Sequence, residues 1–426
     1  MKITYFVNTM FLVEGKHSRI LCDPWITTGN LSRSGLYNYP KLKTRREDLP
    51  NLKPNFIYIS HTHADHFDPD TLDVFDKNMP ILVSWYKNNF TEKAVKKLGF
   101  KDVRVAEENQ FLKLNGNDKC WIEPSAKYSA VDSIAVFQID GLNILNANDC
   151  GFDLDQCTLL KNRFKKIDAA CIPAGMQGPY PAFYENLNLD EKKIESDKKK
   201  YNNFMTVFNY LSVLKPTYFF ALTGGAVYGG KKALLMPYTG VGSAKEVKEF
   251  LINKNFDILT ILLSENCSFD LKTKKIDGKF IDHSFENSND YFKEISLLKS
   301  PFDKGGSFYI AKSEQMDLSV LLFNARNKQL DWQKRLNINL DSVFFIDVGH
   351  DYIYRMCLAD SSVTTIKETE IQDSAYEIFR IPYSLLIGFL TRHYNYSNLK
   401  TQFVDFYRKP DVFNPNLHIL MSHLHL

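Results

Sequence analysis

Three histidines and one aspartate lie within six consecutive residues, 61–66, in the pattern H-x-H-x-D-H. The apolar run before them, Phe56–Ile59, predicts a buried strand that ends where the pattern begins. A strand that feeds a tight loop would direct the first two histidines towards one point and the last two polar residues towards a second point nearby. Imidazole and carboxylate are the ligands that zinc, iron and manganese prefer. A polar loop with surface histidines is the alternative, but the spacing favours a metal site made by His61, His63, Asp65 and His66.

The residues after this loop predict a helix. Asp68-Pro69 is typical of an N-cap followed by a first-turn proline, and apolar residues recur as far as Phe75. The order of strand, ligand loop and helix resembles the metal-binding segment of the metallo-β-lactamase superfamily. That resemblance implies an αββα sandwich, of mixed α/β (α+β) class, with a bridging aspartate after a later strand.

Asp149 stands where the resemblance implies the bridging aspartate. It follows two strand-like runs on either side of Asp140-Gly141, which is a strong signal for a type I′ hairpin. A carboxylate between two cations offsets their repulsion. An ordinary turn aspartate is the alternative interpretation, and we expect the ligand.

Two histidines that the resemblance would imply are missing, because no histidine occurs between His66 and His283. One would lie near Glu123, and the other would follow the strand-like run 218–222, where Thr223-Gly224 stands. We therefore predict fewer imidazole ligands than in the usual two-metal site, and low metal occupancy. Residues that could complete the site are Glu123, Asp132, His350 and the last three histidines, although a packed C-terminal segment explains those three more simply.

Further motifs resemble the CMP-N-acetylneuraminate hydroxylase family without its Rieske domain. They are Asp23-Pro24-Trp25, the segment Tyr180–Glu185 and the segment Phe406–Val412. The resemblance implies hydroxylation of a nucleotide-linked sugar by O₂ at iron, with electrons from a Rieske cluster. It also implies a small anionic, nucleotide-linked substrate, for which we expect Tyr180, Tyr184, Arg392 and Arg408 to be binding residues. Guanidinium groups suit phosphates, and plain surface charge is the alternative for the arginines.

This chain cannot hold a Rieske cluster, because none of its seven cysteines has a histidine two or three residues later. Three functions remain open. The first is an iron-dependent oxygenase that takes electrons from a separate ferredoxin or Rieske protein. The second is a hydrolase in which zinc, iron or manganese activates water and Asp65 orients or deprotonates that water. The third is a non-catalytic module with a weakened metal site.

Composition indicates a globular chain with room for a large core. It has 426 residues, of which 44% are hydrophobic and 24% charged, and its net charge is +3. The weak basicity fits an anionic small molecule and gives no support to nucleic-acid binding. Scattered cysteines, the lack of a signal-peptide pattern and the lack of a long apolar run predict a cytoplasmic protein that does not bind membranes. A change of texture near residue 270 predicts a metal-binding domain over 1–270 and a C-terminal α/β cover domain over 271–426.

Overall fold

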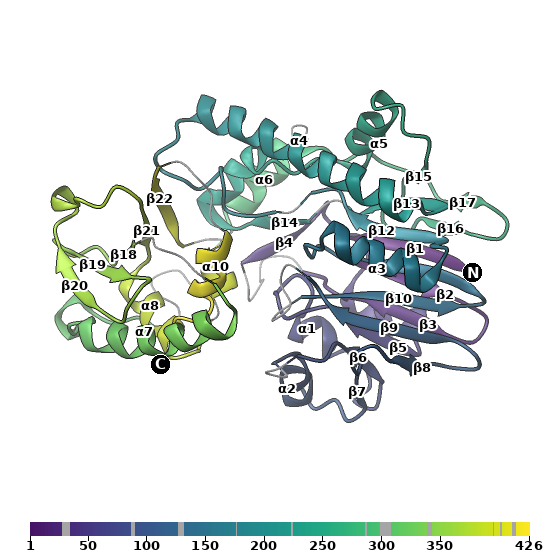
Figure 1. The fold of residues 1–426 in the computed structure, drawn as a ribbon, viewed down its shortest axis with the longest axis horizontal. Coiled ribbons are helices and arrows are strands. Elements are labelled where there is room, and N and C mark those ends of the chain that lie inside the picture. The colour runs from purple at the N-terminus through teal and green to yellow at the C-terminus, as the bar shows by residue number, and fades with distance from the viewer. Residues whose placement is uncertain are drawn as a thin grey trace.

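The computed structural model describes the whole chain except eleven segments. These are residues 28–34, 87–89, 127–131, 176, 223–224, 286–287, 299–307, 339–342, 395, 401–402 and 411–414. The predicted position of the missing histidine at Thr223-Gly224 therefore lies outside the described residues. Figure 1 shows a sandwich of two sheets on the side of the N-terminus and a smaller C-terminal sheet on the other side.

The first sheet of the sandwich has eight strands in the order β17-β16-β1-β2-β3-β5-β6-β7. Strands β1 to β3 are antiparallel, and β3, β5, β6 and β7 run parallel to one another. The strands are β1 Lys2–Val7, β2 Met10–Glu14, β3 Arg19–Cys22, β5 Phe56–Ile59, β6 Ile81–Val83, β7 Val103–Val105, β16 Ser268–Asp270 and β17 Lys275–Asp277.

The second sheet has seven strands in the order β15-β13-β12-β11-β10-β9-β8. Strands β8 to β11 are antiparallel, and β11, β12, β13 and β15 are parallel. The strands are β8 Phe111–Lys113, β9 Lys119–Pro124, β10 Ser133–Ile139, β11 Leu142–Asn146, β12 Ala169–Pro173, β13 Tyr218–Leu222 and β15 Leu259–Ile261.

Alternating apolar residues bury the inner faces of both sheets in one core. Phe56 and Tyr58 of β5 meet Ile122, Ala135 and Phe137 of the second sheet there. Burying each large apolar side chain of this kind contributes roughly 1.5–3 kcal/mol. The core therefore fixes the two sheets face to face and places the ends of β5 and β11 at the same edge.

Helices cover the outer faces and complete the αββα layers (Figure 1). Helices α1 and α2 pack on the first sheet through Leu72 and Val95. Helices α3, α4 and α5 pack on the second sheet, where Leu160, Leu211 and Val247 are fully or almost fully buried. The helices are α1 Pro69–Leu72, α2 Phe90–Lys97, α3 Leu154–Phe164, α4 Leu189–Leu214 and α5 Ala244–Asn253.

Local signals in the sequence are confirmed at the turns and caps. Asp140 and Gly141 have φ of 51° and 79°, as a type I′ hairpin requires. Asp68 caps α1 by accepting a hydrogen bond from the Thr71 amide, with a proline in the first turn. The α-helix ends at Leu72, however, so the prediction that it continues to Phe75 is wrong; a hydrogen-bonded turn from Leu72 to Phe75 follows instead.

The C-terminal sheet has five strands in the order β20-β19-β18-β21-β22. Its largest core is shared with loops of the sandwich, because Trp25, Tyr184 and Tyr228 pack in one cluster with Phe379 and Phe406. The elements are α7 Ser319–Arg335, β18 Val343–Asp347, β19 Ile353–Cys357, β20 Val363–Ile366, β21 Tyr376–Arg380, α8 Tyr383–Leu390, α9 Tyr396–Lys400, β22 Asp405–Lys409 and α10 Pro415–Met421.

The division near residue 270 stays a prediction. Strand β17 continues the first sheet as far as Asp277, and α6 Asn289–Ser296 packs against the 3₁₀ segment Gly230–Tyr238. Between them, these contacts tie the chain after residue 270 to the sandwich.

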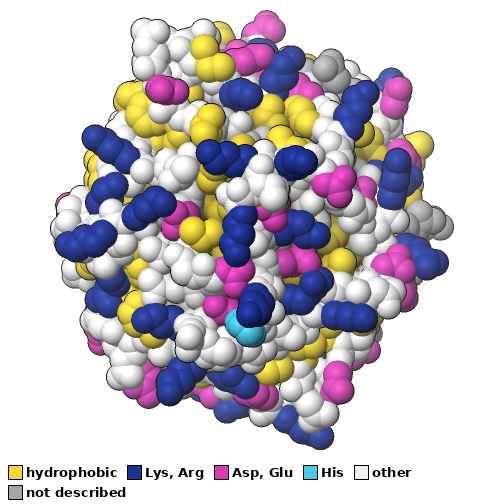
Figure 2. Space-filling model, turned by 90° about the vertical axis from the view of Figure 1, so that its right-hand side faces the viewer, with side chains coloured by type: hydrophobic (Ala, Val, Ile, Leu, Met, Phe, Trp, Pro, Cys, Tyr) yellow, Lys and Arg dark blue, Asp and Glu magenta, His cyan; other side chains and the backbone are white. Residues whose placement is uncertain are grey.

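The face near the N-terminus carries basic and acidic side chains interspersed with one another (Figure 2). No helix among the described residues is long and apolar enough to cross a bilayer. The residues of the predicted metal site lie at another edge of the sandwich, where strands β5 and β11 end.

Candidate metal centre

The H-x-H-x-D-H loop begins directly after β5 and is fixed at both ends. The Ser60 amide donates to Asp23 Oδ1 over 2.8 Å, which anchors the start of the loop. Amides of His66 and Phe67 donate to the carbonyl of His63 over 3.0 and 2.8 Å, which closes a tight turn. These backbone contacts place the imidazoles inside the edge of the sandwich, where His61 and His66 are almost fully buried.

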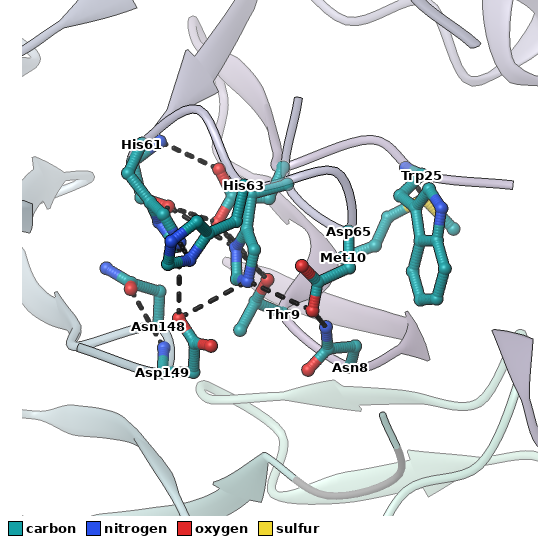
Figure 3. Close-up of polar contacts among 12 residues, drawn as sticks. Asn8, Thr9, Met10, Trp25, His61, His63, Asp65, Asn148 and Asp149 are labelled. Atoms are coloured by element: carbon teal, nitrogen blue, oxygen red, sulfur yellow. Dashed lines mark hydrogen bonds and ion pairs between the residues drawn. The ribbon is translucent and has the colours of Figure 1, made fainter. Parts of the chain in front are cut away.

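Two aspartates at the ends of strands of the second sheet meet this loop, and Figure 3 shows one of them, Asp149, beside His61. Asp149 follows β11, and its Oδ1 lies 3.9 Å from His61 Nε2 and 3.3 Å from His66 Nε2. Asp132 precedes β10, and its Oδ1 lies 3.9 Å from His61 Nε2. His63 Nδ1 lies 2.7 Å from the same nitrogen of His61. The loops after β5 and β11 therefore meet, as the sequence predicted.

Two overlapping clusters of ligand atoms result, and each contains two histidines and one carboxylate. One consists of His61, His63 and Asp132, and the other of His61, His66 and Asp149. Within each cluster the ligand atoms lie within 4.8 Å of one another. His61 belongs to both clusters. Its Nε2 can therefore serve as a ligand to an ion in only one cluster at a time.

Three buried atoms in these clusters fit a bound cation. Among the described residues, Asp132 Oδ1 is buried and has no hydrogen-bond partner, and the buried His66 Nε2 and Asp149 Oδ1 have as their nearest partner only each other, 3.3 Å apart. Leaving a buried polar group unpaired costs about 1–3 kcal/mol, and more for a charged one. A divalent ion between these atoms would remove that cost, so the residues present fit the metal that the loop predicts.

Burial sets the protonation of the first two histidines. It lowers the pKa of His61 well below its usual value, and His66 and His63 lower it further. Burial, followed by the positive charge of Lys400, lowers the pKa of His63 to about 4. Both rings are therefore neutral near pH 7 and have lone pairs available for a metal.

His66 and its acidic neighbours are coupled differently. Burial alone would lower the pKa of His66, but Asp149 and Asp65 raise it well above its usual value. Burial would raise the pKa of Asp149, and His66 outweighs it so that the pKa is lowered. Burial and Asp149 raise the pKa of Asp132. A proton on His66 thus occupies the place of a cation, and a metal would displace it.

Asp23 is a site residue that sequence reasoning noted only as part of a motif. Its carboxylate is fully buried; Oδ2 lies 2.9 Å from His66 Nδ1 and accepts from the hydroxyls of Ser60 and Thr9 over 2.7 and 3.2 Å. Such a carboxylate orients a metal-binding imidazole through its second nitrogen. Its signal in the sequence was an aspartate at the end of an apolar strand, β3.

Asn8 was also missed, and it holds Asp65. Its amide group donates to Asp65 Oδ2 over 3.1 Å from the turn between β1 and β2, where Asn8 has φ of 50° (Figure 3). Asp65 Oδ2 lies 3.5 Å from His66 Nε2. The only signal for Asn8 was an asparagine in a tight turn, which many structural turns also contain.

Replacing Asp23 with asparagine should weaken metal affinity by about 10- to 100-fold, because His66 loses the carboxylate that orients it. Calorimetric titration of the metal-free protein with Fe(II) or Zn(II) measures this. An unchanged affinity would mean that Asp23 only supports the loop backbone.

Two residues predicted to complete the site are not brought to it. Glu123 lies on β9 and belongs to neither cluster of the described residues. His350 lies in the turn after β18, where its Nε2 is 3.0 Å from Gln315 Oε1 and its ring is 5.3 Å from that of Tyr352. Of the three internal residues suggested for completion, the structure brings only Asp132 to the loop.

The last three histidines are packed against other side chains, which is the interpretation that the sequence favoured over a role as metal ligands. His418 lies 3.0 Å from the hydroxyl of Tyr184 and 2.8 Å from that of Tyr396. His423 stacks on Trp332 with ring centroids 4.5 Å apart. His425 lies beside Arg392.

Glu123 offers a test by pH. Burial raises its pKa to about 6, with a smaller opposite effect from Arg163. The folded state therefore disfavours the charged form of Glu123. As a result, the free energy of unfolding of the wild type falls as pH rises from the pKa of Glu123 in the unfolded chain through about 6. We expect Glu123→Gln to unfold at higher urea concentration than wild type at pH 8 and at nearly the same concentration at pH 4. An equal difference at both pH values would contradict this account.

Three of the four predicted substrate-binding residues lie together. The Arg408 guanidinium carbon is 3.7 Å from the ring centroid of Tyr180 and 4.8 Å from that of Tyr184. The hydroxyl of Tyr184 donates to Glu377 over 2.7 Å. Arg408 is 4% exposed, so this cluster joins the sandwich to the C-terminal sheet. Arg392 is exposed and lies apart, 2.6 Å from His425 Nε2.

Residues 2–191 match the family model of the beta-lactamase superfamily domain. With the two-sheet sandwich covered by helices, this match confirms the metallo-β-lactamase fold and the resemblance first indicated by residues 61–66. The chain thus has the fold of a superfamily of metal-dependent enzymes.

Three relatives illustrate the range of that superfamily. A Mycolicibacterium smegmatis protein whose name includes "Rieske 2Fe-2S iron-sulfur protein" is 30% identical over 102 residues, which are 24% of this chain and 19% of that protein. A UPF0173 metal-dependent hydrolase from Pyrobaculum neutrophilum is 24% identical over 180 residues, 41% of this chain and 72% of that protein. The cytidine monophosphate-N-acetylneuraminic acid hydroxylase of Danio rerio is 21% identical over 154 residues, 35% of this chain and 25% of that protein.

The matches thus span about a fifth of the first relative and a quarter of the hydroxylase. Hydrolases and a hydroxylase both occur among the relatives, so the comparisons support metal-dependent chemistry without choosing between these two reactions.

Proposed function

We propose that this chain is an iron-dependent oxygenase that acts on a small anionic metabolite, such as a nucleotide-linked sugar. The observation that carries the proposal is the composition of the two ligand clusters. Each has two imidazoles and one carboxylate, which is the ligand set of non-haem Fe(II) oxygenases, with further positions left open. Iron at such a site supplies the activation of O₂.

The surrounding residues hold this ligand set in place. Burial keeps His61 and His63 neutral, Asp23 orients His66, and Asn8 fixes Asp65 beside it. Asp65 has a lowered pKa, because the effect of His66 outweighs that of burial. Asp65 therefore remains a carboxylate that can accept a proton from a group bound at the site.

We propose that electrons come from a separate protein, either a ferredoxin or a Rieske protein. The sequence lacks the cysteine and histidine spacing of a Rieske cluster, while one relative carries Rieske in its name and another is a hydroxylase. A partner that supplies single electrons would supply what an isolated oxygenase centre lacks.

A metal-dependent hydrolase is the second candidate. Asp65 lies 3.5 Å from His66 Nε2, close enough to orient or deprotonate a water at the same centre. The Pyrobaculum neutrophilum relative, of which 72% is covered, is named a metal-dependent hydrolase. A non-catalytic module is less well supported, because a decayed site would not keep buried ligand atoms unpaired at a cost in stability.

The test loads metal-free protein with Fe(II) or Zn(II) under nitrogen. O₂ consumption is then measured with CMP-N-acetylneuraminate as the probe and reduced ferredoxin as the electron donor. The proposal predicts substrate-dependent O₂ uptake by the iron form and none by the zinc form. His63→Ala, with an unchanged circular dichroism spectrum, is the control and should lose this uptake.

Turnover of the probe by the zinc form without O₂ would favour the hydrolase. Iron that binds without any change in O₂ uptake or in its optical spectrum on exposure to air would contradict the oxygenase. A folded protein that takes up neither metal would support the non-catalytic alternative.

A further inference from the structure

Three buried polar residues each lie next to a predicted metal ligand in the chain, and they are hydrogen-bonded to one another. They are Ser60, Ser133 and Asn148, beside His61, Asp132 and Asp149 respectively. All three are fully buried. Because the ligands come from both sheets of the sandwich, hydrogen bonds among their neighbours can determine how far apart the ligands lie.

The hydroxyl of Ser133 bridges the two sheets. It donates to the carbonyl of Ser60, directly after β5, over 2.7 Å. A serine hydroxyl has one proton, so the Tyr58 hydroxyl, 2.9 Å away, is the donor in its contact with Ser133 Oγ. The Tyr86 hydroxyl donates to the same carbonyl of Ser60 over 3.0 Å. Since Ser133 opens β10 of the second sheet, these bonds join that sheet to the start of the histidine loop.

The backbone of Ser133 reaches the third ligand. Its carbonyl accepts a hydrogen bond from the side-chain amide of Asn148. Asn148 has φ of 39°, and its Oδ1 accepts from the amides of Asp149 and Cys150 over 2.8 and 3.0 Å, which closes the turn after β11. Figure 3 shows Asn148 beside Asp149. Ser133 therefore contacts the turn that carries Asp149 and the loop that carries His61.

The apolar core holds the two sheets together independently of these bonds. Phe56, Ile122 and Phe137 pack between the sheets, and the Tyr58 ring lies edge-on to that of Phe137 with centroids 5.7 Å apart. Removing the Ser133 hydroxyl leaves all of these apolar contacts in place. The fold should therefore persist, and the change should be confined to the edge where the ligands meet.

We propose that Ser133 is a positioning residue of the metal centre, whose hydroxyl and carbonyl hold the histidine loop and the Asp149 turn at the separation that a bound ion requires. This inference rests on the proposed metal-dependent function. Oδ1 of Asp132 and Oδ1 of Asp149 each lie 3.9 Å from His61 Nε2. Two atoms can share one ion only up to about 4.2 Å apart, twice a metal–ligand bond of about 2.1 Å. A small shift between the sheets would therefore break the site.

The test uses the full chain, freed of metal and then titrated with Co(II) under nitrogen. The visible absorption of Co(II) reports the number and geometry of its ligands. Affinity and the spectrum at saturation are measured for wild type, Ser133→Ala, Tyr58→Phe and the double variant, and urea unfolding of each metal-free protein is measured separately. Ser212→Ala is the matched control, because Ser212 Oγ also donates to a backbone carbonyl, that of Phe208 on α4, over 2.7 Å.

We expect Ser133→Ala to bind Co(II) about tenfold more weakly than wild type and to have a changed spectrum at saturation, as when ligands lose an orienting partner. Tyr58→Phe should have a smaller effect. The double variant should match Ser133→Ala, because Tyr58 acts on the site through Ser133. Ser212→Ala should match wild type in both affinity and spectrum.

Wild-type affinity and spectrum in Ser133→Ala would overturn the inference even if its unfolding midpoint falls, because Ser133 would then be only structural. A loss of affinity in the double variant equal to the product of the two single losses would also overturn it. If Ser133→Ala does not fold, Tyr58→Phe decides in its place: a changed spectrum supports the inference, and a wild-type spectrum overturns it. A wild-type protein that binds no Co(II), Fe(II) or Zn(II) would overturn the proposed function as well.

Discussion

Replacing His61 with alanine should remove bound metal and lower any metal-dependent activity by at least about a hundredfold, more than the loss of an orienting partner costs. His61 Nε2 belongs to both ligand clusters, so this one change leaves neither of them complete. Because the ring is held by the loop after β5 and not by the apolar core, the fold should persist. Elemental analysis and circular dichroism of the purified variant measure the two effects.

His17→Ala is the matched control for His61→Ala, since His17 is exposed in the turn between β2 and β3. It should keep wild-type metal content. If His61→Ala retained its metal, the ion would be held by atoms outside the two clusters. If it unfolded, His61 would be a structural residue.

Replacing Asp132 with asparagine should have the next largest effect, weakening metal affinity by about a hundredfold, because an amide oxygen is a poorer ligand than a carboxylate. The structure places Asp132 Oδ1 3.9 Å from His61 Nε2, so Asp132 can supply a ligand in a site that lacks the histidines implied by the resemblance. Titration of the metal-free variant with Fe(II) under nitrogen measures the affinity.

Glu123→Gln is the matched control for the Asp132→Asn experiment. The sequence left Glu123 and Asp132 as equal alternatives, and the structure brings only Asp132 to His61. Glu123→Gln should therefore bind metal like wild type. The reverse result, with loss of affinity only in Glu123→Gln, would refute the assignment of Asp132.

The strand-to-loop-to-helix unit was predictable because its signals are local. A run of apolar residues, a ligand spacing and a capped proline lie within about twenty residues of one another, and each has a physical cause that does not depend on the rest of the chain. The same is true of the Asp140-Gly141 hairpin, whose positive φ angles follow from its residue types. Such signals fixed the position of Asp149 as well.

The sequence alone could not decide whether Asp132 or Glu123 lies at the metal site, because the answer depends on the register of the strands. Strand β10 runs antiparallel to β11, with Ala135 opposite Asn146, so the start of β10 lies beside the end of β11. Glu123 lies on β9 between Ile122 of the inner core and the start of the next loop, and it shares a face with Trp121, which packs under the helices. Side chains alternate along a strand, so Glu123 points away from the inner face.

Contacts between residues hundreds of positions apart could not be predicted from the sequence. Arg408 was predicted to bind phosphate from its residue type alone. In the structure, β22 lies beside the segment of Tyr184, and the rings of Tyr180 and Tyr184 cover the guanidinium group. No local pattern encodes such pairings.

The most direct test of the metal centre is a crystal of the protein grown with Fe(II) under nitrogen, with diffraction data recorded on both sides of the iron absorption edge. We predict an anomalous peak within roughly 2–2.5 Å of His61 Nε2, bounded by the carboxylates of Asp132 or Asp149, at the distances of metal–ligand bonds. A crystal whose iron peak lies elsewhere, or which shows no peak while His61 and Asp149 keep their places, would contradict the account.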